Sequence, residues 1–227
     1  MFFYDWTYLL IIPGLILGLW AQFKVKNTYA EYSRIPTRLD RSAASVVDDL
    51  LRRNGNHKVR IGHVSGQLTD HYNPGNETLN LSDGVYGSDS VAALGIAAHE
   101  AGHAMQKQEG YAPLMLRTAI VPAVNICSTL STPLFFLGLV MAWQPLTTIG
   151  IILFAASTVF ALVTLPVEFN ASSRAVKMLS EGGYIAHDEE QGVRSVLNAA
   201  ALTYVAAAVT SLLSLLRLVL IARRRND

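Results

Sequence analysis

Residues 118–167 carry no charged side chain, although charges are frequent on both sides of this stretch. A helix that spans a bilayer needs about 20 predominantly apolar residues, so the stretch is too long for one span and fits two spans joined by a tight turn. Pro145 interrupts helices and Trp143 suits the membrane–water interface, so we expect the turn within Trp143–Thr148. The sequence therefore predicts a transmembrane hairpin over residues 118–167.

Two other uncharged stretches, Trp6–Phe23 and Ser195–Leu216, are also long enough to cross a bilayer. Hydrophobic residues make up 51% of the chain, which exceeds the roughly 45–50% that is usual for soluble domains. Buried core helices are the alternative, but several such stretches in a chain of 227 residues argue against it. We predict a mainly α-helical, polytopic membrane helix bundle with three or four spans.

The first apolar stretch could be either a cleaved signal peptide or a membrane anchor. The residues before it include no basic group, and residues 21–26 after it do not provide the small-x-small pattern of a cleavage site. We therefore predict an uncleaved anchor helix at residues 1–23.

The basic residues predict which side of the membrane the polar segments occupy. If residues 118–167 cross twice, the polar segments 24–117 and 168–194 emerge on the same face. Basic residues are dense at the start of the first of these segments, so the positive-inside rule assigns that face to the cytoplasm. If the last helix also crosses, the arginines at 223–225 lie on the outer face, against this rule. Whether the last helix crosses is left open. Acidic residues alternate with the basic ones, which fits membrane lipids and not nucleic acid.

Local patterns predict a small α+β portion in the first polar segment, because a helical stripe of valines and leucines precedes alternating strand-like runs. The expected elements are a helix within Asp40–Gly55 with the stripe Val46, Val47, Leu50 and Leu51, a strand within His57–Val64, a turn at Asn73–Asn76, a strand at Thr78–Leu81, and a helix over Asp89–Gln108 capped by Ser88. The predicted segments are the anchor at 1–23, this α+β portion within 24–117, the hairpin at 118–167, a polar segment and loop at 168–194, and a hydrophobic helix with a basic tail at 195–227.

The stretch GIAAHEAGHAMQ places two histidines four residues apart on the last of these helices. At this spacing the imidazoles of His99 and His103 project from one face and can converge on one ion. Glu100 is rotated by about 100° from His99, where a general base could reach a metal-activated water without taking a ligand position. The alternative is an alanine-rich helix that carries two histidines by coincidence, and the predicted helical context argues against it.

A hydrolytic zinc site needs a third protein ligand and an open position for water. The metzincin pattern would place a histidine where Glu109 stands and a glycine where Gln106 stands, so that class is excluded. The candidate is Glu168, which directly follows the uncharged stretch. A transmembrane hairpin would return Glu168 to the face from which the histidine helix enters. The alternative is an ordinary interfacial carboxylate at the end of a helix.

Several motifs together resemble those of the YugP-like neutral zinc metallopeptidases of bacterial membranes. They are HEAGHAMQ, the preceding LTDHYNP and LNLS, and the later LPVEFNASSRA and LNAAALTYVAAA, and the resemblance extends from Tyr32 to Leu216. A more distant similarity is to HtpX-like and Ste24-like membrane proteases, which have a Glu-x-x-x-Asp motif. Here Ser172 stands in place of that aspartate. Support for the histidine ligands is therefore expected to come from elsewhere or to be weaker.

The resemblance implies a zinc metalloendopeptidase of the gluzincin type with a zincin-like catalytic portion. His99, His103 and Glu168 would bind one Zn²⁺, and Glu100 would be the general base. The substrates would be proteins or peptides, cleaved at the cytoplasmic face of a bacterial plasma membrane. By the same analogy, strand Thr78–Leu81 would hold an extended substrate at a sheet edge. Membrane lipids are the other expected partners, and a homo-oligomer is left open.

Two other classes of function compete with this interpretation. One is a non-proteolytic, zinc-binding regulator or scaffold, although a scaffold has no need of Glu100 as a base. The other is a zinc hydrolase of a small or lipid-like substrate, or a transporter, although the middle spans contain no charge. His187, Tyr184 and Arg174 could each serve the reaction or be solvated loop residues. His71 and Tyr72 could line the cleft or pack the turn. His57 and His63 are expected at the surface.

Overall fold

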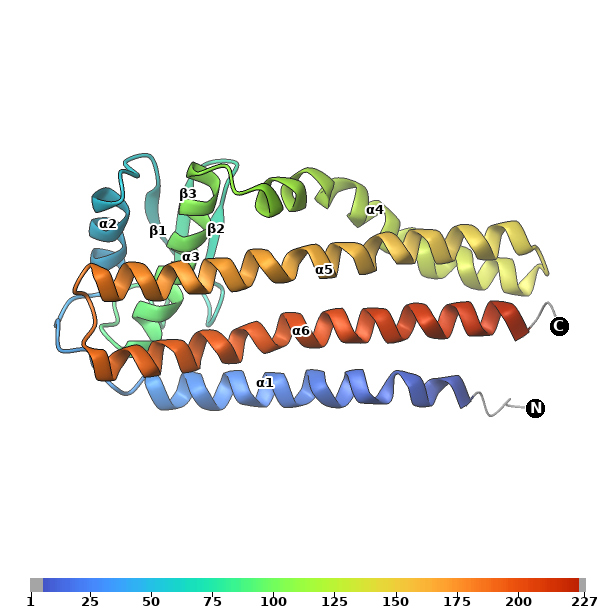
Figure 1. The fold of residues 1–227 in the computed structure, drawn as a ribbon, viewed down its shortest axis with the longest axis horizontal. Helices are drawn as coiled ribbons and strands as arrows, with labels where there is room; N and C mark the ends of the chain where they lie inside the picture. Colours follow the sequence, from blue (N-terminus) through green and yellow to red (C-terminus); the bar gives the residue numbers. More distant parts are fainter. Residues whose placement is uncertain (1–5, 225–227) are drawn as a thin grey trace. The chain divides into compact units, whose positions relative to one another are not determined.

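The computed structural model describes residues 6–224 and is mainly helical, with one small sheet (Figure 1). In chain order the elements are the 3-10 helix η1 (Trp6–Leu10), α1 (Ile12–Tyr32), α2 (Ala43–Arg53), β1 (Arg60–Val64), β2 (His71–Asn73), β3 (Thr78–Ser82), α3 (Val91–Gln108), α4 (Ala112–Val140), α5 (Gln144–Glu181) and α6 (His187–Arg224). The first five residues of the predicted anchor and the last three of the predicted basic tail lie outside the described residues.

The chain divides into two compact units, and the four long helices α1, α4, α5 and α6 contribute to both. The first, called the helix unit here, consists of residues 1–22, 116–165 and 202–227. The second, called the sheet unit, consists of residues 23–115 and 166–201. The sheet unit contains the sheet, α2 and α3, together with the ends of α5 and α6 that carry most of their charged residues.

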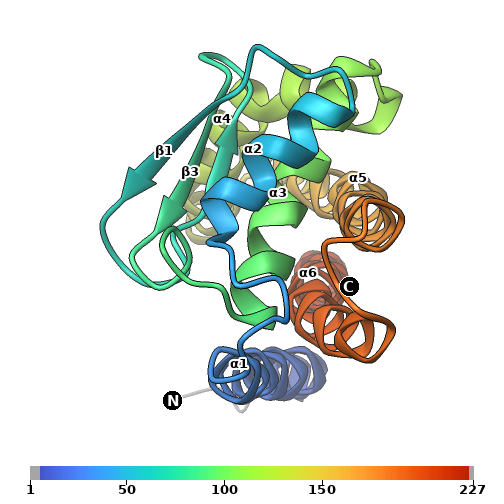
Figure 2. The same cartoon turned by 90° about the vertical axis from the view of Figure 1, so that its left-hand side faces the viewer.

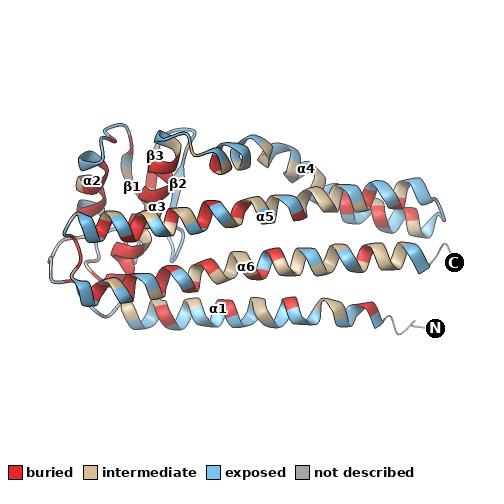
Figure 3. Cartoon of the chain, viewed as in Figure 1, coloured by how far each residue is buried: buried red, intermediate tan, exposed pale blue. Residues whose placement is uncertain are grey.

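Four helical segments are long and apolar enough to cross a membrane, which confirms the predicted polytopic bundle. They are Trp6–Tyr32, Ala112–Val140, Gln144–Glu181 and His187–Arg224. Figure 3 shows exposed and half-buried residues along these helices and a concentration of buried residues at α3. Large apolar side chains such as Leu15, Ile126 and Ile152 lie on their surfaces. A hydrocarbon environment suits such surfaces, whereas water does not.

The hairpin between α4 and α5 turns earlier than predicted. α4 ends at Val140 and α5 begins at Gln144, so the turn is at residues 141–143 and not within Trp143–Thr148. Pro145 lies in the first turn of α5, where the missing N–H of a proline has no helical partner to lose. The proline therefore begins the second helix and does not form the turn. A glycine allows the helices to touch, because a Cβ on Gly150 would lie 2.6 Å from the main-chain nitrogen of Phe135.

The sheet has the strand order β1-β3-β2, with β1 parallel and β2 antiparallel to β3. Residues 78–82 therefore have a paired strand on both sides. This corrects the expectation that strand Thr78–Leu81 holds a substrate at a free edge. Alternation of apolar residues reveals that a segment is a strand, but it does not reveal the order of the strands. The short strand His71–Asn73 forms one edge, although the sequence pattern predicts only a turn at Asn73–Asn76 here and no strand before it.

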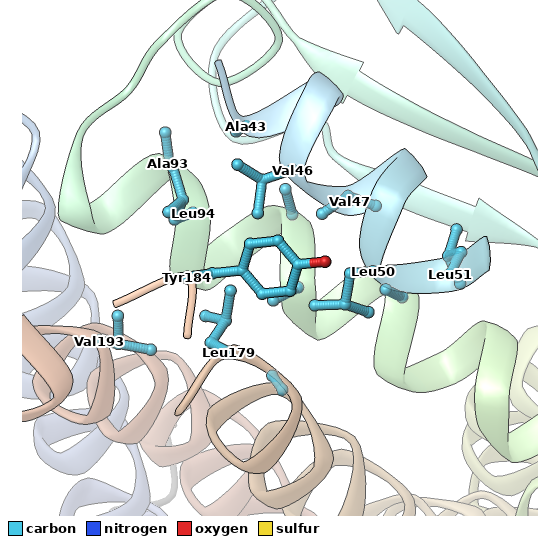
Figure 4. Packing of buried hydrophobic residues seen from close by; sticks show 14 of the residues in the cluster. Ala43, Val46, Val47, Leu50, Leu51, Ala93, Leu94, Leu179, Tyr184 and Val193 are labelled. Atoms are coloured by element: carbon cyan, nitrogen blue, oxygen red, sulfur yellow. The ribbon is translucent and has the colours of Figure 1, made fainter. Parts of the chain in front are cut away.

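α2 and α3 pack against each other and against the sheet, and Figure 2 shows both helices on one side of β1 and β3. The predicted stripe of α2 is buried, and it contacts small residues of α3 and leucines of β3. Tyr184, from the loop after α5, inserts its ring among these side chains (Figure 4). Burial of each leucine of this core contributes about 1.5–3 kcal/mol. This core fixes α3, which carries the histidines, onto the sheet.

The N-terminus of α3 lies two residues after the predicted one. Ser90, and not Ser88, is the N-cap, with an extended backbone and a side chain that accepts a hydrogen bond from the main-chain nitrogen of Ala93 over 3.2 Å. The Ser88 hydroxyl supports it, since Ser88 Oγ and Ser90 Oγ lie 3.0 Å apart. The C-terminus at Gln108 agrees with the prediction.

Candidate active site

The side chains of His99 and His103, on α3, meet the side chain of Glu168, on α5. One potential ligand atom from each of the three residues lies within 4.8 Å of the other two. Nε2 of His99 is 3.2 Å from Oε2 of Glu168, and Nε2 of His103 is 3.5 Å from the same oxygen. The structure therefore brings together the three residues that the sequence suggests as metal ligands.

Small residues allow α3 and α5 to approach closely enough for this meeting. A Cβ on Gly102 would lie 2.5 Å from the carbonyl oxygen of Ala171, so the two helices are in backbone contact there. Ala98 and Ala101 of α3 are completely buried. Glu168 precedes Ala171 by one helical turn, so the contact places the carboxylate beside the histidines. The glycine between the two histidines is thus a condition for their meeting with Glu168.

The buried carboxylate suits a cation. Glu168 is 2% exposed and His103 is 9% exposed, and a carboxylate this deep is stable only when positive or donating groups surround it. Tetrahedral zinc, with bonds of about 2.0–2.1 Å, needs ligand atoms roughly 3.4 Å apart. The two separations from the histidines to Glu168, 3.2 and 3.5 Å, agree with that requirement, and all three atoms lie within 4.8 Å of one another. Two imidazole nitrogens and one carboxylate oxygen are also the donor types that zinc prefers.

The charges around His103 favour its protonated form. Burial disfavours the charged form of His103, but the hydrogen bond to Glu168 and the negative charges of Glu100 and Glu168 raise the pKa of His103 overall. A buried imidazole whose protonated form is favoured lies in a site of negative potential. That potential also favours a divalent cation.

Glu100 lies outside the three-residue cluster, as its position on the helix requires. Its Oε2 accepts a hydrogen bond of 2.9 Å from the main-chain nitrogen of Tyr72, in β2. Tyr72 is paired with Leu79 of β3, and its N–H points away from β3 toward α3. The edge strand that faces the site is therefore β2.

Tyr72 lines a cavity and does more than pack the turn. A cavity of about 450 Å³ is bordered by Tyr72 together with Ala104 and Lys107 of α3. Burial, together with the negative charge of Glu77, raises the pKa of Tyr72 to about 12, so the phenol stays neutral and can donate a hydrogen bond. The neighbouring His71 packs the hairpin instead, because its Nδ1 is 2.9 Å from the carbonyl oxygen of Thr69.

Each histidine of the cluster has a neutral partner on its other ring nitrogen. Oγ of Ser172 lies 3.1 Å from Nδ1 of His99, so the serine occupies the supporting position with a hydroxyl. Oε1 of Gln106 lies 3.0 Å from Nδ1 of His103. From the sequence alone, Gln106 stands out only because it replaces the glycine of the metzincin pattern. Its spacing of three residues from His103 on one helix face could have indicated the contact.

The other residues that the sequence left open, for a role in the reaction or at the surface, do not contribute ligand atoms to the cluster. Tyr184 is buried and donates a hydrogen bond of 3.0 Å to Oδ2 of Asp49, so it is not a solvated loop residue. Arg174 forms an ion pair of 2.7 Å with Glu109. His187 is the first residue of α6, and His63 is 2.7 Å from Oδ1 of Asp83 on the surface.

Comparisons with known proteins agree with this chemistry. The model of a family described as "Putative neutral zinc metallopeptidase" matches residues 7–223. The chain is 47% identical over 218 residues to a protein of Bacillus subtilis (strain 168) named "Putative membrane protease YugP", and the match covers 96% of this chain and 97% of that protein. No solved structure matches the chain.

Proposed function

Because the chain belongs to this family of neutral zinc metallopeptidases, we propose that it is a membrane-embedded endopeptidase of the gluzincin type. In this proposal His99, His103 and Glu168 hold one Zn²⁺, and Glu100 is the general base. The observation that carries the proposal is the meeting of the three ligand atoms within 4.8 Å, from helices that are far apart in the sequence. The substrates are proteins or peptides.

The roles of the residues follow from their geometry. A bound zinc ion supplies Lewis-acid chemistry, which polarises a substrate carbonyl and allows water to react at neutral pH. Glu100 accepts the proton of the attacking water and delivers it to the leaving amine. Its hydrogen bond to the main chain of Tyr72 holds one carboxylate oxygen in place during this transfer.

Strand β2 is the element that presents an extended substrate to the site. It is an edge strand, and its residue Tyr72 directs a main-chain N–H toward Glu100. A peptide segment that pairs with this edge would run past the general base, because edge strands bind extended chains through main-chain hydrogen bonds. This mode of binding favours unfolded or extended segments over folded domains.

The reaction takes place at the cytoplasmic face of a bacterial plasma membrane. Basic residues dominate the stretch after the first candidate span, which is the pattern of a cytoplasmic segment. The residues of the site all belong to the sheet unit, where residues 23–115 and 166–201 come together. Substrates would therefore be cytoplasmic segments of proteins, or peptides close to the bilayer.

The test compares purified, zinc-loaded wild-type protein with Glu100→Gln in detergent, using a mixture of membrane proteins and peptides. Products are identified by mass spectrometry, and zinc content is measured for both proteins. Glu181→Gln, on an exposed end of α5, is the matched control for the loss of a carboxylate. Products from wild type and control but not from Glu100→Gln would support the proposal. Identical products from all three zinc-bound proteins would overturn it in favour of a regulator or a hydrolase of small substrates.

A further inference from the structure

Gln106 is completely buried, and the hydrogen bonds of its side chain connect His103 with two residues that flank Glu168 on α5. Its Oε1 contacts Nδ1 of His103 over 3.0 Å, and its Nε2 contacts two groups of α5. We propose that Gln106 is a positioning residue that fixes His103 in its metal-binding form and clamps α3 to the segment of α5 that carries Glu168. This inference rests on the proposed function, because it assumes that His103 and Glu168 bind the metal.

The orientation of the Gln106 amide is determined by its partners on α5. Nε2 donates a hydrogen bond of 2.8 Å to the main-chain carbonyl of Val167, which can only accept. It also donates one of 2.9 Å to Oδ1 of Asn170. The identity of that oxygen is fixed in turn, because Nε of Arg174 donates to it over 2.7 Å and has no acceptor capacity. The amide nitrogen therefore faces α5, and the amide oxygen faces His103.

This polarity selects one tautomer of His103. An amide oxygen can only accept, so Nδ1 of His103 must carry the hydrogen that it donates to Gln106. The neutral imidazole then has its lone pair on Nε2, the atom that lies 3.5 Å from Glu168. Nε2 is thus the ring nitrogen left to face Glu168 and a metal ion. The hydrogen bond of the second ring nitrogen commonly sets which nitrogen of a metal-binding histidine is free.

The same amide also sets the separation between α3 and α5 at the site. Val167 immediately precedes Glu168, and Asn170 follows it by two residues. Gln106 thus holds α5 on both sides of the proposed third ligand, while its own helix carries the two histidines. The neighbouring backbone contact at Gly102 brings the helices together, and Gln106 fixes their register. One buried side chain therefore relates all three ligands.

The chain of contacts that begins at Gln106 and Asn170 continues through Arg174 at the surface and ends at the C-terminus of α3. Arg174, which orients Asn170, forms an ion pair of 2.7 Å with Glu109, the C-cap residue of α3. The guanidinium also lies over the ring of Tyr111, 5.9 Å from its centroid. The partly exposed Arg174 is thus restrained on two sides. The hydrogen bonds form a closed path from α3 to α5 and back.

The first test uses Gln106→Met in the purified full-length protein. Methionine has a similar length and no amide, so Nδ1 of His103 and the carbonyl of Val167 both lose a partner. Zinc affinity is measured by competition with a chelator at fixed pH, and the geometry of the site by the absorption bands of bound Co²⁺. We expect zinc to bind about 10–100-fold more weakly, the usual effect of losing an outer partner of a metal ligand. The Co²⁺ bands should change as well.

The control is Gln108→Met, the same substitution on the exposed end of the same helix. It should leave both zinc affinity and the Co²⁺ spectrum unchanged. Equal zinc affinity and equal Co²⁺ spectra for wild type and Gln106→Met would overturn the inference while leaving the proposed function intact. A wild-type protein that binds no zinc would overturn the proposed function instead.

A second pair of variants covers the case in which Gln106→Met does not fold. Asn170→Asp keeps the oxygen that accepts from Gln106 and Arg174, whereas Asn170→Leu removes it. We expect Asn170→Asp to retain zinc affinity within a few-fold and Asn170→Leu to lose about tenfold or more. A purely steric role for the side chain would make the two variants alike, and that result would contradict the inference.

Discussion

The main-chain N–H of Tyr72, in the edge strand β2, donates a hydrogen bond of 2.9 Å to Oε2 of Glu100, on α3. The proposed general base is thus held by the strand that we propose to bind the substrate. A substrate that pairs with β2 would lie next to Glu100 without any further movement of the carboxylate. The first prediction concerns this carboxylate.

Glu100→Gln should keep zinc and lose peptidase activity. Glutamine retains an oxygen that can accept from the Tyr72 N–H, so the fold of the site is preserved, but it cannot accept a proton from water. We expect the catalytic rate to fall about 10²–10⁴-fold, the usual contribution of general acid–base catalysis. Activity is measured on a peptide identified in the first digestion, and zinc by elemental analysis. A variant with wild-type rates would remove Glu100 from the mechanism.

Glu168→Ala should lose zinc. The side chain supplies the only carboxylate in the three-residue cluster of the described chain, so its removal leaves two imidazoles and no carboxylate ligand. We expect affinity to fall by more than the roughly 10–100-fold that loss of an outer partner costs. Zinc retained after gel filtration is the measurement, with Glu181→Ala as the control on the same helix. Full zinc occupancy of Glu168→Ala would exclude the third ligand proposed here.

Gly102→Ala should weaken both the fold and the metal site. The added Cβ would lie 2.5 Å from the carbonyl oxygen of Ala171, so α3 and α5 must separate. Such overpacking typically lowers the free energy of unfolding by about 1–3 kcal/mol. Thermal unfolding in detergent and zinc affinity should both decrease. Gly87→Ala is the control, because a Cβ there has nothing within 4 Å. Equal behaviour of the two variants would argue against close contact of the helices.

Tyr184→Phe should make the protein less stable at neutral pH and less sensitive to acid. The hydrogen bond from Tyr184, helped by Arg41 and Arg53, holds the pKa of Asp49 below its usual range. A carboxyl whose pKa is lower in the folded state stabilises the fold above its unfolded pKa of about 3.9, and this stability is lost as the pH falls through the folded pKa. Without the phenol, that acid-sensitive contribution shrinks.

The measurement for this prediction is the midpoint of thermal unfolding from pH 7 downward. At neutral pH we expect Tyr184→Phe to unfold at a lower temperature than wild type, because the hydrogen bond to Asp49 is lost. Below about pH 4 the wild-type and variant midpoints should converge. Tyr86→Phe, at a partly exposed tyrosine, serves as the control. Parallel curves for wild type and Tyr184→Phe over the whole range would show that this hydrogen bond does not set the pKa of Asp49.

Much of the fold follows from local features of the sequence. Uncharged stretches predict the transmembrane helices because hydrocarbon excludes charge, and this prediction is confirmed by the four candidate spans. The stripe of α2 is buried as expected, because its period matches a helix with one face on a core. The shared face of His99 and His103 is likewise a property of one helix.

Contacts between segments were harder to predict, because they depend on how the elements pack. The uncharged stretch suggested that Glu168 returns to the histidines, since a membrane restricts where a hairpin can end. Nothing comparable restricts the order of three short strands, so the central position of β3 and the edge position of β2 came only from the structure. The predicted position of the turn between α4 and α5 was also wrong. Proline can either end a helix or stand in the first turn of one, and Pro145 stands in the first turn of α5.

The sequence by itself determined the membrane helices, the histidine-bearing helix and the family of the protein, since each depends on residue type and spacing along one segment. Only the tertiary structure decided which side chains support the site. Gln106 reaches Val167 and Asn170 across two helices in backbone contact, and a buried amide acquires its role from the donors and acceptors that surround it. Those neighbours come from distant parts of the chain, and packing alone brings them within hydrogen-bonding distance.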